Sequence, residues 1–112
     1  MVSVTSACYK RYPVSGSTLF QAESMEATGE LIDISRGGAR IRSEVKPLEG
    51  AEIAVRFTVQ NYLEVFEVRG IVLRVQSDSW AVLFLEEPAG LAKLLRSLDE
   101  RTQKREASPI GI

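Results

Sequence analysis

The chain has 112 residues, of which 45% are hydrophobic and 26% are charged, and its formal net charge is -1. This composition is typical of one globular domain, and the charge excludes a global field that would attract nucleic acid or anionic lipid. The chain contains no histidine, which removes the usual general base at neutral pH, the nucleophile pairs built on it and the histidine-rich metal sites. We therefore expect no enzyme, no catalytic residue, no metal and no cofactor.

The sequence also indicates a cellular compartment. No run approaches the roughly 18 apolar residues of a membrane span, and the start MVSVTSACYKRYPV lacks the pattern of a secretory signal. The single cysteine, Cys8, cannot form a disulfide within the chain, which agrees with a reducing environment. We expect a cytoplasmic protein that does not contact a membrane.

The first part of the chain reads as a lead-in followed by a strand. Residues 1–17 are rich in Ser, Thr, Gly and Pro and carry the basic pair Lys10 and Arg11. Apolar residues spaced at two then predict a strand over 18–25, and the small residues 27–29 indicate a turn after it.

Two further strands are predicted over 31–35 and 39–43, joined by the short segment SRGG. The alternation of the second of these directs its apolar side chains toward the core and both arginines, Arg40 and Arg42, outward. For these arginines two interpretations stay open, an ordinary solvated strand face and a ligand-facing role.

The middle of the chain predicts three more strands. Residues 51–60 alternate cleanly. Residues 62–75 are rich in β-branched and aromatic types, but their apolar phase changes between Val65 and Val72, and this slip, with Gly70 inside it, suggests a bulge where the strand bends around a barrel. A sixth strand is predicted over 80–86. It opens with Trp80, for which a core position is favoured over a base-stacking surface.

After Pro88 the period changes to 3.6, with leucines at i, i+3, i+4 and i+7 from Leu91 to Leu98. This pattern predicts a helix whose apolar stripe packs over an opening or edge of the sheet rather than against a partner helix. Residues 102–112 are predicted to be a flexible tail. Six strands with short turns and one helix indicate a small antiparallel barrel or sandwich over 18–101.

The segment DISRGG between the second and third predicted strands combines turn chemistry with a pattern of functional interest. Asp33 and Ser35 have short side chains that hydrogen-bond to nearby backbone, and the glycines permit positive φ, so a well-capped turn is one interpretation. The pattern Asp-x-Ser-x-x-Gly, completed by Gly38, arises by chance in a chain of this length only about a few per cent of the time. A site built on the turn is the other interpretation.

With this motif in place about twenty residues after a basic segment, the sequence resembles the PilZ domain family. Members of that family carry an arginine motif RxxxR in the lead-in and (D/N)xSxxG between the second and third strands, and VRGIVLRVQSDSWAVLFLE resembles their fifth and sixth strands. The resemblance implies a six-stranded antiparallel PilZ-type β-barrel with a C-terminal helix. It also implies a nucleotide-binding receptor for cyclic di-GMP, the bacterial second messenger.

The chemistry of the ligand suits the residues of this sequence. A guanidinium group can pair with guanine O6 and N7 or with a phosphate, and a carboxylate can accept hydrogen bonds from the guanine N1 and N2 edge. The resemblance and this chemistry together give a set of candidate ligand-binding residues: Lys10, Arg11, Asp33, Ser35, Arg36 and Gly38.

The arginine motif is incomplete in this chain. One register makes Arg11 the second arginine and places the first on Ala7, and another pairs Lys10 with the first and Val14 with the second. In either register at least one guanidinium group is missing. The loss of one charged hydrogen bond weakens binding by roughly ten- to a hundred-fold.

Three functions follow from the sequence. The favoured one is a cyclic di-GMP receptor, a monomer or a homodimer, that signals to an unidentified protein partner in the control of motility, pili, biofilm or exopolysaccharide. The alternative is a degenerate PilZ domain that binds no cyclic di-GMP and acts as a protein adaptor. An oligonucleotide-binding barrel is disfavoured, because the net charge is near zero and aromatic residues do not alternate with basic ones on a strand.

Overall fold

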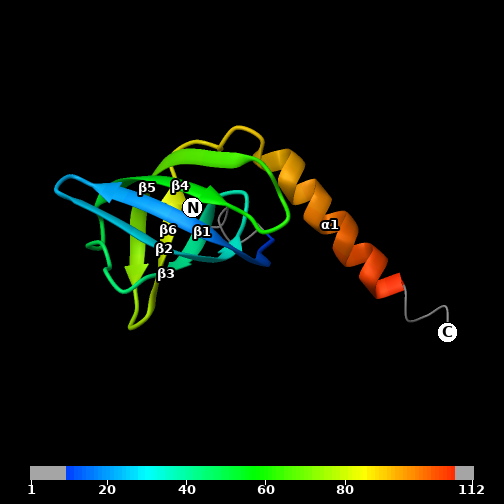
Figure 1. Ribbon diagram of the computed structural model, residues 1–112, viewed down its shortest axis with the longest axis horizontal. Coiled ribbons are helices and arrows are strands. Elements are labelled where there is room, and N and C mark those ends of the chain that lie inside the picture. The colour runs from blue at the N-terminus through cyan, green and yellow to red at the C-terminus, as the bar shows by residue number, and fades with distance from the viewer. Residues whose placement is uncertain (1–9, 108–112) are drawn as a thin grey trace, which may run out of the picture.

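The structure, a computed structural model, describes residues 10–107 and contains six strands and one helix in this part of the chain. The elements are β1 (Tyr12–Ala22), β2 (Met25–Ile34), β3 (Gly38–Arg42), β4 (Glu52–Thr58), β5 (Val65–Val75), β6 (Ser79–Phe84) and α1 (Leu91–Ala107). The strands pair antiparallel in the closed order β1-β2-β3-β6-β5-β4 (Figure 1). The expected six-stranded antiparallel barrel with a C-terminal helix is thereby confirmed, and closure removes the exposed strand edges that an open sheet would have.

The core fills the inside of the barrel, with Trp80 at its centre. Trp80 is fully buried, and its ring meets that of Phe20 edge to face at a centroid distance of 4.8 Å. Its Nε1 donates a hydrogen bond to Ser43 Oγ at 2.9 Å, which satisfies the one polar atom of the ring. Trp80 is therefore a core residue, as the favoured interpretation of the sequence had it.

The first hairpin is longer than the sequence predicts. β1 begins at Tyr12, inside the expected lead-in, and the turn lies at residues 23–24 rather than at 27–29. Gly29 lies within β2 and pairs with Thr18 of β1, and a Cβ at this position would come within 2.7 Å of the carbonyl oxygen of Arg42 on β3. This glycine allows a close approach of two strands, and the expected turn is wrong.

The irregularity of β5 lies just beyond the stretch from Val65 to Val72 where the sequence places it. Gly70 pairs regularly with both neighbouring strands, and the register shift lies between Val72 and Arg74. Gly70 occupies an inward-facing position where a Cβ would lie 2.6 Å from the carbonyl oxygen of Leu83. Phe66, Val68, Gly70 and Val72 all face inward in one phase, so the apparent change of phase came from Val65, which is exposed.

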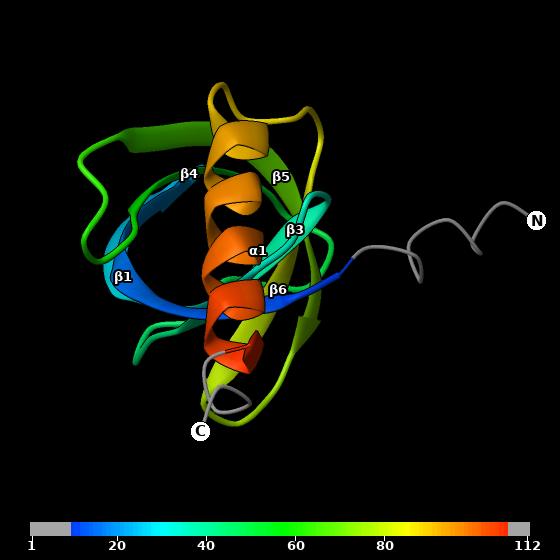
Figure 2. The same ribbon diagram turned by 90° about the vertical axis from the view of Figure 1, so that its right-hand side faces the viewer.

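Helix α1 closes one end of the barrel. Leu91 and Leu94 in its first turns are buried in the core, and Leu95 and Leu98 are partly buried against it. Figure 2 shows the helix lying across the end of the barrel, and Figure 1 shows its later turns extending away from the strands. The helix continues to Ala107, so residues 102–107 are helical where the sequence predicts a tail, and residues 108–112 lie outside the described part. The helix found in the described residues is too short and too polar to cross a membrane.

Candidate functional site

The DISRGG segment lies where the motif predicts, at the junction of β2 and β3. The backbone N–H of Ser35 donates to the carbonyl oxygen of Gly38 at 2.8 Å, and Ser35 Oγ donates to the same oxygen at 3.3 Å. The side chain of Ser35 is buried. Its hydroxyl therefore closes the turn in this structure, which is the capping role that the sequence indicates.

Gly38 has a packing role in addition to its place in the motif. A Cβ on Gly38 would run into the carbonyl oxygen of Val82 on β6. Because β3 and β6 are neighbouring strands of the barrel wall, only a glycine lets them approach this closely. The expectation that Gly38 lets the backbone approach a ligand is not tested by this contact.

A register shift aims Asp33 out of the core. Leu31 and Ile34 on β2 are both fully buried although they are three residues apart, and the pairing of β2 with β3 shifts between Leu31 and Asp33. The side chain of Asp33 is consequently directed to the outer face of the barrel, opposite Arg40 of β3, with 21% of it exposed. A bulge that re-aims one side chain in this way is common beside functional sites.

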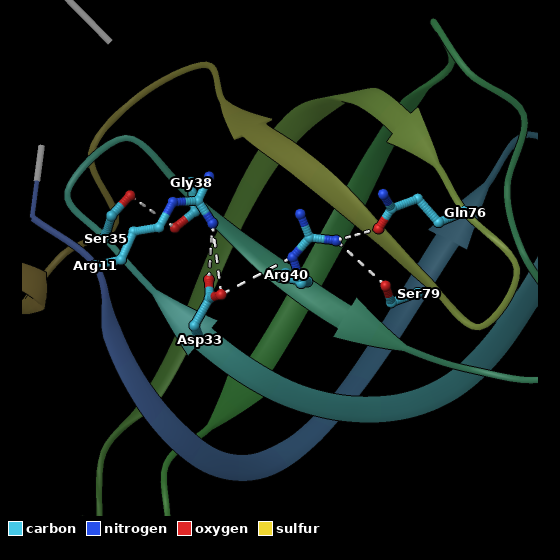
Figure 3. Close-up of polar contacts among 7 residues, drawn as sticks. All are labelled: Arg11, Asp33, Ser35, Gly38, Arg40, Gln76 and Ser79. Carbon is cyan, nitrogen blue, oxygen red and sulfur yellow. Dashed lines mark hydrogen bonds and ion pairs between the residues drawn. The ribbon is translucent and has the colours of Figure 1, made fainter. Parts of the chain in front are cut away.

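The lead-in meets the motif through Arg11. Arg11 Nη1 lies 3.3 Å from Asp33 Oδ1 and 3.4 Å from Oδ2, across 22 residues of sequence (Figure 3). Val14, by contrast, packs partly buried against the core. The structure thus brings together one predicted residue from each motif and places Arg11, not Val14, at the site. Ala7 lies outside the described residues.

Arg40 also faces the carboxylate of Asp33. Its Nε lies 3.9 Å from Asp33 Oδ2, and its Nη1 donates to Gln76 Oε1 at 2.8 Å and to Ser79 Oγ at 3.2 Å. Figure 3 shows the carboxylate of Asp33 between the guanidinium groups of Arg11 and Arg40. The alternation of the third predicted strand had placed Arg40 on the outer face, but it could not show which acidic residue lies beside it.

The other predicted basic residues contact acids away from Asp33. Lys10 Nζ lies 3.0 Å from Asp99 Oδ1 on α1, and Arg36 Nε lies 3.3 Å from Glu87 Oε1. The structure therefore does not bring Lys10 and Arg36 to Asp33.

Asp99 is a junction between the lead-in and the helix. Besides Lys10, the hydroxyl of Tyr12 donates to Asp99 Oδ1 at 3.2 Å. The hydrogen bond from Lys10 lowers the pKa of the Asp99 carboxyl below its usual value. Burial, with the hydrogen bond to Asp99, raises the pKa of the Tyr12 hydroxyl. The charged carboxylate thus holds the start of β1 to α1.

A metal site would require several side chains in the described part of the chain that could bind the ion together. No three His, Cys, Asp or Glu side chains among the described residues come together as metal ligands. The site around Asp33 is instead a set of charged hydrogen-bonding groups, which suits an anionic ligand with polar edges.

The described part of the chain is thus a small closed β-barrel with a cluster of charged side chains on its outer face. A family model, the PilZ domain, matches residues 7–100, and the chain belongs to the PilZ domain family. PilZ domains are ligand-binding or adaptor domains rather than enzymes. A comparison with curated proteins gives no match.

Three solved structures share the fold. The inhibitor of motility MotI/DgrA of Bacillus subtilis aligns with a TM-score of 0.73 and 18% identity over 87% of this chain and 51% of that protein, so the chain spans about half its length. The PilZ domain of CeSA from a cellulose-synthesizing bacterium aligns with a TM-score of 0.58 and 17% identity, over 70% of this chain and 82% of that one. An uncharacterized Legionella protein aligns with a TM-score of 0.57 and 19% identity, over 88% of this chain and 99% of that one.

Proposed function

We propose that this PilZ domain is a cytoplasmic receptor for cyclic di-GMP that signals to a protein partner. The observation that carries the proposal is the contact of Arg11 with Asp33, because it joins one residue of each family motif in a single cluster. The family to which the chain belongs supports the same type of ligand.

The contacts at Asp33 suit an exchange of partners when a ligand enters. The side chain of Arg11 is 58% exposed, and an ion pair of this kind contributes about 0 to 1 kcal/mol. A phosphate or a guanine edge that replaced it would make charge-assisted hydrogen bonds of about 1.5 to 3 kcal/mol. Opening the ion pair between Arg11 and Asp33 therefore costs less free energy than the hydrogen bonds to the ligand contribute. Arg11 would turn to the phosphate or base, and Asp33 would accept hydrogen bonds from guanine N1 and N2.

The same segment offers a route from the site to α1. Side chains alternate along extended chain, so Lys10 and Tyr12 point to one side and Arg11 to the other. On one side lies Asp99 of α1 and on the other Asp33. A ligand that draws Arg11 toward itself would displace its two neighbours and loosen their hold on Asp99. We propose α1 and the lead-in as the surface that a partner reads.

The process controlled is proposed from the family and from its structural relatives. One relative is described as an inhibitor of motility, and another is the PilZ domain of a protein from a cellulose-synthesizing bacterium. Control of motility, pili, biofilm or exopolysaccharide is the corresponding proposal for this chain.

Isothermal titration calorimetry with cyclic di-GMP tests the receptor. We expect saturable binding, a loss of roughly ten-fold or more in Arg11→Ala and Asp33→Ala, and no change in Arg56→Ala. Arg56 is a matched control, because it is also 58% exposed and also pairs with one acid, Glu67, but lies on β4. An absence of both heat and melting-temperature shift up to millimolar ligand would contradict the proposal.

A variant that restores the family motif sharpens this test. Ala7→Arg supplies the arginine that the register through Arg11 lacks, and we expect it to bind about ten- to a hundred-fold more tightly than the natural chain. An unchanged affinity would show that position 7 is not the first position of the motif.

The second candidate function is a protein adaptor that binds no cyclic di-GMP. The ion pairs of Lys10 with Asp99 and of Arg36 with Glu87 favour it, because they hold these two basic residues away from Asp33. It predicts that the natural chain binds no cyclic di-GMP while keeping a cooperative thermal transition. Binding that depends on Arg11 would exclude it.

A further inference from the structure

Five basic side chains lie on the lead-in, in the DISRGG segment and on β3, and their acidic partners divide them into two groups. Lys10, Arg36 and Arg42 each have an acid of their own: Asp99, Glu87 and Glu30, at 3.0, 3.3 and 3.3 Å. Arg11 and Arg40 share a single carboxylate, that of Asp33. Among the described residues the site around Asp33 therefore carries one positive charge in excess, which an anionic group of a ligand would neutralise.

Arg40 is also the better fixed of these two arginines. Its side chain is 26% exposed, against 58% for Arg11. Gln76 and Ser79, at the turn between β5 and β6, hold its Nη1 at 2.8 and 3.2 Å. A guanidinium group that is already ordered loses little conformational freedom when it binds, so more of its hydrogen-bond energy appears as affinity.

The orientation of Arg40 leaves donors for a ligand. A guanidinium group has five N–H groups, and the contacts of Arg40 with Gln76 and Ser79 use Nη1. Its Nε faces Asp33 at 3.9 Å, which is too long for a direct hydrogen bond. Figure 3 shows the remaining nitrogen directed away from all three of these residues. The guanidinium group is thus held at Nη1, while Nε lies beside Asp33 and the remaining nitrogen makes no contact with these three residues.

We infer that Arg40 is the second guanidinium group of the ligand site, and that it supplies from β3 the contact that the incomplete lead-in motif lacks. The inference rests on the proposed cyclic di-GMP binding. A ligand between Arg11 and Arg40 would meet two guanidinium groups from opposite sides of Asp33, one largely exposed and one held by Gln76 and Ser79. In this arrangement Arg40 pairs with a phosphate or with guanine O6 and N7.

Arg42 provides a matched control. It lies on the same strand and the same outer face as Arg40, two residues further on, and it pairs with Glu30 instead of Asp33. The substitutions Arg40→Ala and Arg42→Ala therefore remove the same chemical group from neighbouring positions of one strand.

Calorimetric titration of cyclic di-GMP into the natural chain, Arg11→Ala, Arg40→Ala and Arg42→Ala tests the inference. We expect a loss of roughly ten- to a hundred-fold in Arg40→Ala and a change of less than about two-fold in Arg42→Ala. If the natural chain binds, Arg11→Ala weakens it and Arg40→Ala behaves like Arg42→Ala, this inference fails and the proposed function stands. If the natural chain does not bind, the proposed function fails and this inference fails with it.

The contacts of Arg40 with Gln76 and Ser79 also join β3 to the turn between β5 and β6, so the melting temperature of each variant is measured beside its affinity. Should Arg40→Ala unfold at the working temperature, Arg40→Gln replaces it, because glutamine keeps an amide N–H donor, on a shorter side chain, without the charge. A folded Arg40→Gln variant with natural affinity would overturn the inference, and one with the expected loss would support it.

Discussion

The substitution Gly38→Ala separates the structural from the ligand-binding role of the PilZ motif. A Cβ at position 38 would collide with the carbonyl oxygen of Val82, which belongs to the backbone of β6 and cannot rotate away. Strands β3 and β6 would have to separate at this point of the closed barrel. Overpacking of this kind costs about 1 to 3 kcal/mol, and a collision with backbone belongs in the upper part of that range.

Ser35→Ala is the comparison within the same motif. It removes the Oγ contact with the carbonyl oxygen of Gly38 at 3.3 Å but keeps the backbone bond of 2.8 Å to the same oxygen. The cost is that of one hydrogen bond, about 1 kcal/mol. For a domain of this size about 1 kcal/mol lowers the melting temperature by about 4 °C.

Thermal unfolding followed by circular dichroism is the assay. We expect Gly38→Ala to melt about 8 to 12 °C below the natural chain and Ser35→Ala about 4 °C below it. A Gly38→Ala variant that melts within about 2 °C of the natural chain would refute the argument from strand approach. If that variant also lost ligand binding, Gly38 would act at the ligand rather than in the barrel wall.

Three further predictions concern the core and the lead-in. Thr18 Oγ1 is buried without a hydrogen-bond partner among the described residues, so Thr18→Val should raise the free energy of unfolding in urea by about 1 kcal/mol; a decrease would contradict this. Trp80→Phe removes the bond to Ser43 and leaves a cavity, so it should lower the free energy of unfolding by about 2 to 4 kcal/mol, and a loss below 1 kcal/mol would contradict the packing. Lys10 lowers the pKa of Asp99 below its usual value, so the resulting stabilisation is present above about pH 4 and is lost as the pH falls further. The melting temperature of Asp99→Asn, followed from about pH 7 down to about pH 2, should therefore decline less steeply on the acid side than that of the natural chain.

Much of the fold could be predicted because its signals are local. Strand alternation predicted β3, β4 and β6 closely, and the leucine spacing predicted α1 and its packing on the barrel. The hairpin of β1 and β2 was wrong because Gly29, read as a turn, permits a close contact with residue 42 that is distant in sequence. A glycine can mark a tight approach or a turn, and only the fold tells the two apart.

The candidate site divides in the same way. Asp33, Ser35 and Gly38 form a continuous motif, and its place between β2 and β3 was correct. The pairing of each basic residue with its acid joins segments far apart in the chain, as with Lys10 and Asp99. Sequence could therefore nominate Arg36 and Arg40 alike, while the structure directs Arg36 to Glu87 and Arg40 to Asp33.

The bulge in β2 explains why the site exists on an otherwise regular barrel. With strict alternation from the buried Leu31, Asp33 would point into the core, where an ionised carboxylate carries a large desolvation cost. The register shift after Leu31 buries Ile34 instead and directs Asp33 outward to Arg40. The sequence conceals this shift, because Leu31 is apolar in one phase of the alternation and Ile32 and Ile34 are apolar in the other. A single extra residue in β2 thus moves Asp33 from an inward position to the outer face, where Arg11 and Arg40 share its carboxylate.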